Sequence, residues 1–406
     1  MARLQLDEIV SAGLCSGCGA CVFAATEGAV SMQLDSKGYL RPVANRELAQ
    51  AEHIAIREVC PGIGLTHPAT LAKGIAYHPV WGPMASLMSG HANDPEVRHK
   101  GSSGGVLSAL LIHLLDTGKV DFVVHTRASD ADPLLNQTVF SATREDILSG
   151  AGSRYAPAAP VAALRAALAR PGKFAFVGKP CDVAAVRKIV LARPAVAKRI
   201  PYLLSFMCAG TPSMAGTHEI LQRFGMQATD VKSFRYRGDG WPGLARAETT
   251  DGRFETMDYN TAWGTILNKH LQPRCKMCAD GTGEFADVVC ADAWYGKDGY
   301  PDFAEADGRS LLITRTESGT TLASDSVASG AISTTSFDHS LLSDIQPYQK
   351  RRKLEMPARR IAAQVLRHPW PHYRHLRLGL CFKQLSLHQS IKAFIGTALR
   401  LLNGRI

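Results

Sequence analysis

Cysteines recur every third residue near the start of the chain, at Cys15, Cys18 and Cys21, and a later cysteine, Cys60, is followed at once by proline. A C-x2-C-x2-C run with a remote C-P is typical of segments that wrap a cubane iron–sulfur cluster. Only serine, glycine and alanine stand between the first three thiols, so the chain can turn tightly enough for them to converge. A zinc site usually draws two ligands from each of two loops. The spacing therefore predicts a 4Fe–4S cluster at these four residues.

The compartment expected from the sequence is one in which thiols stay reduced. The first residues, MARLQLDEIV, carry acidic side chains where a secretory signal needs an apolar stretch. No apolar run approaches the ~18 residues of a spanning helix. We therefore expect a cytoplasmic protein, in which disulfides or purely structural thiols are the weaker alternative.

The net charge of +10 is concentrated near the end of the chain. Between residues 350 and 406, thirteen lysines and arginines stand against one acidic residue, Glu355. Such a segment favours an anionic membrane surface or an acidic protein partner, and we rank nucleic acid below both. A solvated surface is the simpler alternative. Apolar residues at helical spacing predict an amphipathic helix in this segment. They are Leu387, Ile391, Phe394, Ile395, Ala398 and Leu402. A location peripheral to the inner membrane is therefore the alternative to a purely cytoplasmic one.

The expected fold class combines α+β and α/β parts within 406 residues. Residues 1–66 suggest a small ferredoxin-like module, and 67–83, rich in proline, a linker. A strand–helix alternation over 84–233 predicts an α/β unit with a largely parallel core. Residues 234–345 shift to strands and loops, and 350–406 form a basic helical tail. Within 84–233 we expect strands at 121–126, 173–177 and 202–207, and helices at 104–115, 160–169 and 182–191.

A second set of thiols follows in the later part of the chain. Cys275 and Cys278 form a C-x2-C pair, while Cys181 and Cys208 each come just after a predicted strand. The carboxyl ends of parallel strands share one edge of a sheet, where cofactors bind, so these thiols can converge. From the residues alone, zinc, a redox-active dithiol, a second cluster and buried structural thiols all remain open. The remaining Cys290 and Cys381 fit neither set, and we interpret both as structural.

A glycine-rich loop opens a predicted helix at residues 100–105. Small residues at a helix start expose backbone N–H groups that suit a phosphate or pyrophosphate, although capping by Ser103 explains the pattern equally well. The loop residues are Lys100, Gly101, Ser102, Ser103, Gly104 and Gly105. A second run, Ser153, Arg154 and Tyr155, offers a guanidinium and an aromatic ring, or forms an ordinary turn with a stacked Arg–Tyr pair.

From Leu14 to Gly319 the sequence resembles the coenzyme F420 hydrogenase/dehydrogenase beta-subunit family. The matching stretches are GSSGGVLSALL, GSRYAPAAPVAAL, FVGKPCDVAAVRK, FMCAGTP, RCKMCAD, ADVVCADAW and LLITRTESG. The resemblance implies FAD in the α/β unit and iron–sulfur clusters that feed it electrons. It implies that the two runs above, with Lys179 and Asp292, contact the flavin, and that Cys181, Cys208, Cys275 and Cys278 bind a second 4Fe–4S cluster.

One departure from the family pattern lies close to these residues. The family's Gly-Asp-Ala-Trp is here Ala291-Asp292-Ala293-Trp294, and the added methyl group is expected to tighten the packing. The chain also lacks the long apolar-aromatic insertion of the family's chlorophyll reductases, which weakens a pigment substrate.

The expected function is that of an iron–sulfur flavoprotein oxidoreductase. Electrons from a ferredoxin or a similar donor would pass through two 4Fe–4S clusters to FAD and an organic substrate, whose catalytic residues the sequence does not identify. The alternatives are a non-catalytic electron-transfer subunit of a larger redox complex, a reductase of polysaccharide biosynthesis, and a zinc-stabilised binding protein.

Overall fold

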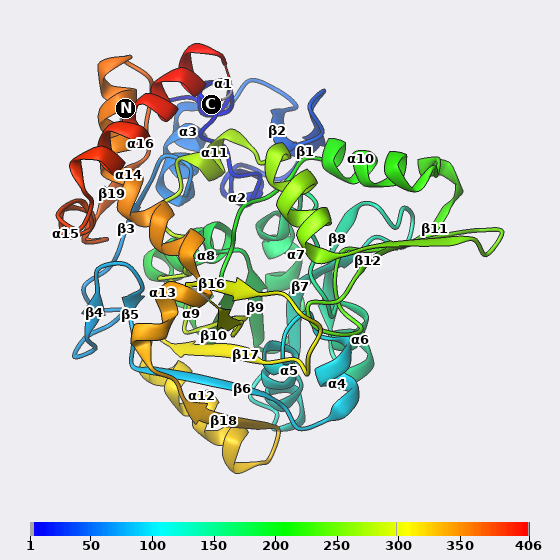
Figure 1. The fold of residues 1–406 in the computed structure, drawn as a ribbon. Helices are drawn as coiled ribbons and strands as arrows, with labels where there is room; N and C mark the ends of the chain where they lie inside the picture. Colours follow the sequence, from blue (N-terminus) through cyan, green and yellow to red (C-terminus); the bar gives the residue numbers. More distant parts are fainter. Residues whose placement is uncertain (1–3, 298, 405) are drawn as a thin grey trace.

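The computed structural model describes residues 4–297, 299–404 and 406. Its centre is an eight-stranded mixed sheet with the order β18-β6-β17-β14-β10-β9-β7-β8 (Figure 1). In that order the strands are β18 (Ile332–Ser336), β6 (Ser86–Ala92), β17 (Ser310–Thr314), β14 (Val288–Asp292), β10 (Tyr202–Phe206), β9 (Phe174–Gly178), β7 (Phe122–Ala128) and β8 (Asn136–Ser141). The predicted parts 84–233 and 234–345 thus contribute strands to one sheet.

The middle of this sheet is parallel and its two flanks are antiparallel. Strands β14, β10, β9 and β7 run in the same direction, so the largely parallel core expected from the sequence is present there. Antiparallel pairings join β8 to β7 on one side and β17, β6 and β18 on the other. Ser205 lies opposite Gly178, and Phe206 opposite Cys290, so three strands end at one edge.

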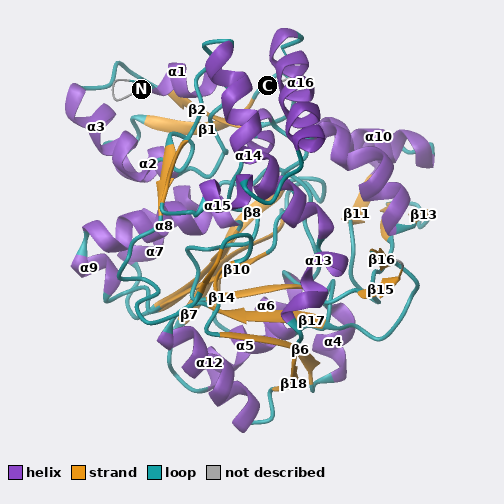
Figure 2. Ribbon diagram, turned by 60° about the vertical axis from the view of Figure 1, so that its left-hand side comes forward, coloured by secondary structure: helices purple, strands orange, loops and turns teal. Residues whose placement is uncertain are grey.

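Side chains of the central strands alternate between two cores on opposite faces of the sheet, as the pleat requires. Val123 and Ala175 point to one core, and Phe122 and Phe174 to the other. The first core is covered by α4 (Pro95–Lys100), α5 (Val106–Asp116), α6 (Arg144–Ser149) and α12 (Glu317–Ala328). The second is covered by η1 (Pro160–Ala163), α7 (Leu164–Ala169) and α8 (Pro180–Ala192), with α9 (Pro194–Ala197) beyond it (Figure 2).

The N-terminal module packs on the second face of the sheet. It consists of α1 (Leu6–Ser11), α2 (Ala20–Ala24), the antiparallel pair β1 (Val30–Leu34) and β2 (Leu40–Ala44), α3 (Gln50–Val59) and β3 (Gly64–Thr66). Its apolar side chains join those of α8 in one continuous core. Arg165 of α7 ties the two units together because it donates to the carbonyls of Phe23 (3.0 Å) and Ala25 (2.9 Å).

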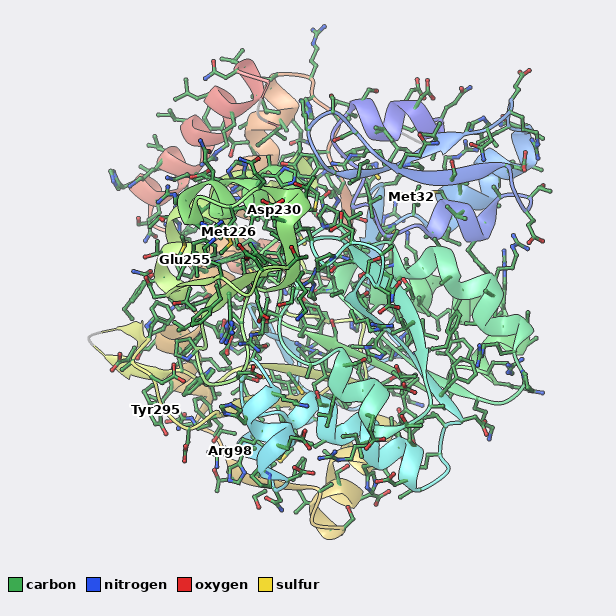
Figure 3. The ribbon with its side chains drawn as sticks, turned by 90° about the vertical axis from the view of Figure 1, so that its right-hand side faces the viewer. Met32, Arg98, Met226, Asp230, Glu255 and Tyr295 are labelled. Carbon is green, nitrogen blue, oxygen red and sulfur yellow. The ribbon has the colours of Figure 1, made fainter. Side chains whose placement is uncertain are left out.

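A third core forms beside the sheet, between α10 and a three-stranded antiparallel sheet. Its elements are α10 (Met214–Phe224), η2 (Ala228–Asp230), β11 (Val231–Arg235), β12 (Ala245–Thr249), β13 (Phe254–Met257), a π-helical turn η3 (Asn260–Ile266) and η4 (Leu267–His270). In Figure 3, Met226, Asp230 and Glu255 mark this unit, well apart from Met32 on the N-terminal module. The short helix α11 (Pro273–Lys276) follows it.

The basic C-terminal segment is a folded part of the body and not a free tail. It contains α13 (Leu342–Ile345), α14 (Pro347–Val365), β19 (His372–Arg374), α15 (Leu378–Phe382) and α16 (Leu387–Leu402), after the short turn η5 (His339–Leu341). Strand β19 pairs in parallel with β3 of the N-terminal module. Buried Lys353 of α14 forms an ion pair with the fully buried carboxylate of Glu284. At least one cation of this segment, expected to be available to a membrane or a partner, is therefore paired inside the molecule.

The expected linker at 67–83 is also folded. It forms the short pair β4 (Tyr77–His78) and β5 (Gly82–Pro83), and the side chains of Val80 and Trp81 are buried. A second short pair, β15 (Tyr295–Lys297) and β16 (Tyr300–Asp302), lies near α13. Across the described ranges, no helix combines the length and apolarity needed to cross a membrane.

Candidate functional site

The first cysteine set lies on the loop between α1 and α2 and at the end of α3. Cys15 and Cys18 are buried, and Cys21 and Cys60 are partly exposed. The turns between them need glycine, because Gly17 (φ +73°) and Gly19 (φ +84°) adopt left-handed backbone conformations. A Cβ at Gly19 would stand 2.7 Å from the backbone nitrogen of Ala162 in η1. The structure thus gives a steric reason for the small residues between these thiols.

The four predicted thiols of this set are close enough to influence one another. Burial raises the pKa of Cys21 well above its usual value, and charge on Cys15, Cys18 and Cys60 raises it further. Burial raises the pKa of Cys15 as well. Deprotonating such a set requires nearby positive charge, which a bound metal centre or basic side chains can supply.

The second cysteine set assembles from three separate segments. Cys208 follows β10, Cys181 lies in the first turn of α8, and Cys275 and Cys278 lie on and just after α11. Burial raises the pKa of Cys208 to about 12, and Cys275 and Cys278 contribute to that shift. Cys181 is likewise influenced by Cys208. The backbone N–H of Thr211 donates to the Cys275 sulfur at 3.3 Å. The structure therefore brings together all four residues predicted for the second set.

The two sets are neighbours. Burial raises the pKa of Cys18 to about 12, and the largest electrostatic cause is Asp182 in α8, directly after Cys181. Cys18 in turn affects the pKa of Cys181. Asp182 is held by Lys179, whose Nζ donates to Oδ2 at 2.7 Å. Thus the first turn of α8, which carries Cys181 of the second set, lies beside Cys18 of the first set.

Hydrogen bonds also join the two cysteine loops directly. The Gln272 amide, three residues before Cys275, donates to the carbonyl of Ser16 at 3.0 Å and accepts from Arg41 at 3.0 Å. Arg274 donates through Nη2 to the carbonyl of Pro61 at 2.9 Å. Neither loop can move far without disturbing the other.

Arg274 is a buried cation whose surroundings contain thiols and no paired carboxylate. Among the described residues, no acidic side chain forms an ion pair with it, and its Nε is buried with no hydrogen-bond partner. Burial acts to lower the pKa of Arg274, but Tyr373 and the thiols of Cys278 and Cys181 outweigh it and raise the pKa above its usual value. A buried guanidinium without a counter-ion is costly. Its placement fits an anionic group held by these cysteines.

Other basic groups surround the same thiols. Lys188 of α8 donates through Nζ to the Cys60 carbonyl at 2.9 Å. Arg352 of α14 donates to the Cys208 carbonyl at 2.8 Å and also to that of Ala209. Within the described ranges, no group of three or more His, Cys, Asp or Glu side chains is close enough to hold a single metal ion.

A cavity of about 310 Å³ opens where the central parallel strands end. Nine of the predicted flavin-contact residues line it: Gly101, Ser102, Ser103, Gly105, Ser153, Arg154, Tyr155, Lys179 and Asp292. Cys208 of the second set also lines it. The edge of the sheet thus places one wall of the cavity against the thiols.

Two residues of the glycine-rich loop lie outside the cavity wall. Lys100 forms an ion pair with Glu96 at 2.8 Å, one turn earlier on α4. Gly104 packs against the sheet, and a Cβ there would stand 2.7 Å from the backbone nitrogen of Ser310. Ser103 does not cap α5: its hydroxyl bonds that of Ser310 at 2.8 Å, and the N-cap is Gly105, with a φ of +72°. Capping by Ser103 is therefore wrong as an explanation of this loop.

The residues of the second predicted run, Ser153, Arg154 and Tyr155, have different roles in the cavity wall. Ser153 donates to the hydroxyl of Ser102 at 2.8 Å and so joins the two loops. The guanidinium of Arg154 donates hydrogen bonds to the Asn136 side chain (2.8 Å) and to backbone carbonyls, including that of Phe234 (2.8 Å). Its guanidinium lies over the ring of Tyr236, not Tyr155, so the stacked Arg154–Tyr155 pair is not formed.

Arg237, which no sequence motif singled out, organises the other wall of the cavity. Its almost fully buried guanidinium donates to both carboxylate oxygens of Asp292, at 2.8 and 3.0 Å, and to the Ser102 carbonyl at 2.5 Å. The indole of Trp241 also donates to Asp292, at 2.8 Å. The signal was the segment RYRGDGWPG, in which Gly238, Gly240 and Gly243 all have positive φ values, but no spacing connects it to a distant aspartate.

Aromatic side chains that the sequence did not single out complete this wall. The guanidinium of Arg237 lies 4.5 Å from the ring centre of Tyr259, and Trp294 stacks on Trp241 at 4.7 Å. Further cavity residues are Trp263, Tyr300, Phe303 and Tyr348. Tyr259 directly precedes the π-helical turn η3, a distortion frequent at functional sites.

Ala291 and the two cysteines outside both sets, Cys290 and Cys381, lie in or near buried parts of the molecule. Ala291, where the family has glycine, lines the cavity together with Cys290. Burial raises the pKa of Cys290 to about 12, and its thiol joins the core on the α5 side of the sheet. Cys381 is buried in α15, where its sulfur lies 3.2 Å from the Pro79 carbonyl oxygen.

A mixed sheet with a cavity at the carboxyl ends of its parallel strands defines an α/β protein, and ligands of α/β proteins commonly bind at this edge. Residues 87–165 and 172–340 match the N-terminal and C-terminal family models of the coenzyme F420 hydrogenase/dehydrogenase beta subunit. The chain belongs to this family, as its motifs predicted.

Individual relatives show how far the similarity extends. The coenzyme F420-dependent sulfite reductase of Methanocaldococcus jannaschii is 25% identical over 333 residues, which is 79% of this chain but 47% of that protein. The chain therefore spans about half the length of that relative. The beta subunit of coenzyme F420 hydrogenase from Methanococcus voltae is 26% identical over 277 residues, 66% of this chain and 88% of the relative.

A solved structure supports the fold. A chain of the F420-reducing [NiFe] hydrogenase complex from Methanosarcina barkeri superposes with a TM-score of 0.55 at 22% identity, covering 71% of this chain and 95% of that one. At this identity the likeness concerns the fold alone.

Proposed function

We propose that the chain is an oxidoreductase that holds two 4Fe–4S clusters and FAD and moves electrons between a ferredoxin-type donor and an organic substrate. The relatives named as hydrogenase, dehydrogenase and sulfite reductase support a redox role. The observation that carries the proposal is the order in which three sites adjoin one another. The first thiol set lies beside the second, and the second shares Cys208 with the cavity.

The clusters would be held by Cys15, Cys18, Cys21 and Cys60 in the 1–66 module, and by the second set. That second set is Cys181, Cys208, Cys275 and Cys278. A cubane cluster is held by four cysteine thiolates, which is the number that each set provides. The basic groups Arg274, Lys188 and Arg352 fit the negative charge of such a centre.

FAD would occupy the cavity at the edge of the sheet. The first turn of α5 has no side-chain cap, so its backbone N–H groups suit a pyrophosphate. Within the preceding loop, the N–H groups of Gly101 and Gly104 already donate to the Val97 carbonyl and the Ser310 hydroxyl. Arg237 holds both the Ser102 carbonyl of this loop and Asp292, so a single buried side chain sets the distance between the two walls. The aromatic wall of Tyr259 and Trp294 offers flat apolar surface beside the polar one. Clusters bound by the two thiol sets would supply single-electron transfer. A flavin bound in the cavity would convert single-electron transfer into two-electron chemistry.

Anaerobic purification with counts of iron, labile sulfide and flavin tests this proposal. We expect about eight irons and about one FAD per chain, together with flavin and iron–sulfur absorption. About four irons would contradict the second cluster, and zinc without sulfide would indicate the zinc-stabilised binding protein instead. Loss of iron from a variant with all four residues of one set changed to serine would assign each cluster.

A second candidate is a non-catalytic electron-transfer subunit, which is favoured by the names of several relatives as subunits of larger enzymes. The two candidates differ in what the purified chain does alone. Turnover of an organic substrate, including reduced or oxidised coenzyme F420, with dithionite or reduced ferredoxin as donor supports the enzyme. Co-purification of a separate catalytic chain, with no turnover by this one, supports the subunit. A reductase role in polysaccharide biosynthesis would appear as turnover of a saccharide substrate.

A further inference from the structure

Helix α16 turns its large apolar side chains away from the protein. The residues that face α14 are small, with Ala393 and Thr397 buried. The exposed apolar residues are Leu387 (78%), Ile391 (49%), Ile395 (50%), Leu399 (55%) and Leu402 (70%). At 100° per residue these five positions fall within about a third of the helix circumference. A surface helix normally shows the opposite arrangement, with its apolar stripe toward the core.

This apolar stripe lies on the outside of the molecule. Figures 1 and 2 both show α16 at the periphery, with α14 between it and the central sheet. Neighbouring helices add exposed apolar side chains, including Val365 on α14 and Phe382 on α15. An exposed apolar stripe along a whole helix marks an interaction site.

The charges around the stripe restrict what can cover it. His388 and Lys392 are exposed on the same side of α16, and the helix contains no acidic residue. The one carboxylate between 346 and 406, Glu355, already accepts from Arg351 at 2.9 Å and from Arg359. A second copy of this chain docked on the stripe would bring like charges together without a carboxylate of this helix to neutralise them. Anionic lipid head groups provide the missing negative charge, and acyl chains provide an apolar phase for the stripe.

We propose that α16 is a membrane-surface helix that lies along an anionic bilayer with Leu387, Ile391, Ile395, Leu399 and Leu402 inserted. The inference is independent of the cofactors, since none of these side chains lines the cavity or contacts the thiol sets. Arg352, Lys353 and Arg359 of the basic segment are not available for this contact, because they are used inside the fold.

Flotation of the full-length protein with vesicles tests this inference. We expect binding to vesicles of phosphatidylglycerol and phosphatidylcholine, weakened by salt, and little binding to phosphatidylcholine alone. The double variant Ile391→Gln/Ile395→Gln should lower partitioning by about tenfold or more, because two inserted side chains are lost. Lys392→Gln should lower it less. The matched control is Leu191→Gln/Phe254→Gln, which changes two equally exposed apolar residues on α8 and β13 and should bind like the wild type.

Three outcomes would overturn the inference. They are absence of binding to anionic vesicles, equal binding by the Ile391/Ile395 double variant, and a concentration-dependent dimer that this variant abolishes. The last would make α16 an interface between copies, and a protein partner that needs the stripe while vesicles do not bind would make it a subunit interface. Iron and flavin counts on the same samples keep this test separate from the proposed function, because they should not differ between the variants.

Discussion

At the scale of single residues, the charges near the thiols are as informative as the thiols themselves. Free cysteines in a protein interior are often small apolar groups, and proximity alone does not make them ligands. A buried arginine with no carboxylate partner is harder to explain without an anionic neighbour. Arg274 has such surroundings, and it also reaches the Pro61 carbonyl next to the first set. It therefore links the chemistry of one set to the geometry of the other.

Replacing Arg274 by methionine should have opposite effects on the cluster-free and the loaded protein. Without clusters, removal of a buried charge that has no carboxylate partner should raise the free energy of unfolding. With clusters, loss of the counter-charge should reduce iron retention toward about four atoms per chain. Denaturant unfolding before and after anaerobic reconstitution measures both effects, and Arg274→Lys is the control that keeps the charge. Destabilisation of the cluster-free protein by the methionine would contradict this account of Arg274.

His125, in the cavity wall on β7, should make the protein less stable at acidic pH. Burial is the main cause that lowers the pKa of His125 from 6.5 to about 4, and the imidazole bonds the Ser141 hydroxyl at 2.7 Å. The unfolded chain binds a proton below about pH 6.5, whereas the folded chain does not until about pH 4. Stability contributed by the neutral imidazole is therefore present above pH 6.5 and is lost as the pH falls, by about 3 kcal/mol at pH 4.

The measurement for His125 is the free energy of unfolding between pH 4 and 7 for the wild type and His125→Gln. The variant should show a flatter dependence on pH, because the glutamine does not titrate. Parallel curves for the two proteins would show that other groups cause the acid sensitivity.

At the scale of elements, the sequence predicted what is local and periodic. The strand expected at 173–177 is observed at Phe174–Gly178, and the amphipathic helix near the end is observed as α16. In both cysteine sets the thiols lie close enough to influence one another's pKa, and their binding of clusters stays a prediction. Arg237 was not predicted because its role depends on Asp292. The fold brings these two residues together, and no local sequence pattern connects them. The segment 67–83 was predicted to be a linker because it is rich in proline. Its buried Trp81 shows that it is part of the core, and no local pattern indicated this burial.

The turn at Gly19 should be needed for the first thiol set, and the chain offers a close control. Gly19 and Gly28 both have left-handed backbones, with φ of +84° and +76°. A Cβ at Gly28 meets nothing within 4 Å, whereas one at Gly19 meets Ala162 at 2.7 Å. Gly28→Ala should therefore cost only about 1 kcal/mol of backbone strain. Gly19→Ala should in addition push the cysteine loop from η1 and remove about four irons per chain. Equal iron contents in the two variants would disprove this steric role.

At the scale of the whole molecule, the last part of the chain closes the site. Helix α14 contributes Gln349 and Tyr348 to the cavity wall, Arg352 to the Cys208 carbonyl and Lys353 to the buried Glu284. These contacts join residues more than sixty positions apart in sequence. The basic composition of 350–406 thus reflects internal pairing in α14 as well as surface chemistry in α16.

Two shortened chains should separate these roles. A chain ended after Gln346 leaves Glu284 buried without its cation, which typically costs about 3–5 kcal/mol, and should lose the iron of the second set. A chain ended after Leu385 lacks only α16 and should keep its iron, flavin and unfolding midpoint while losing vesicle binding. Iron analysis and thermal unfolding of both chains are the measurements. Full iron retention in the shorter chain would contradict the closing role of α14.

The parallel pairing of β3 with β19 has a consequence for how the protein is made. Gly64 lies beside His372, so β3 has no partner until about three hundred further residues have left the ribosome. Helix α14, which covers the Cys208 loop, also emerges late. During synthesis the cysteines at 15–60 are therefore delivered long before the second set can be covered. On the proposed function, a cofactor delivered during synthesis would reach the thiols of the second set before α14 docks over the Cys208 loop.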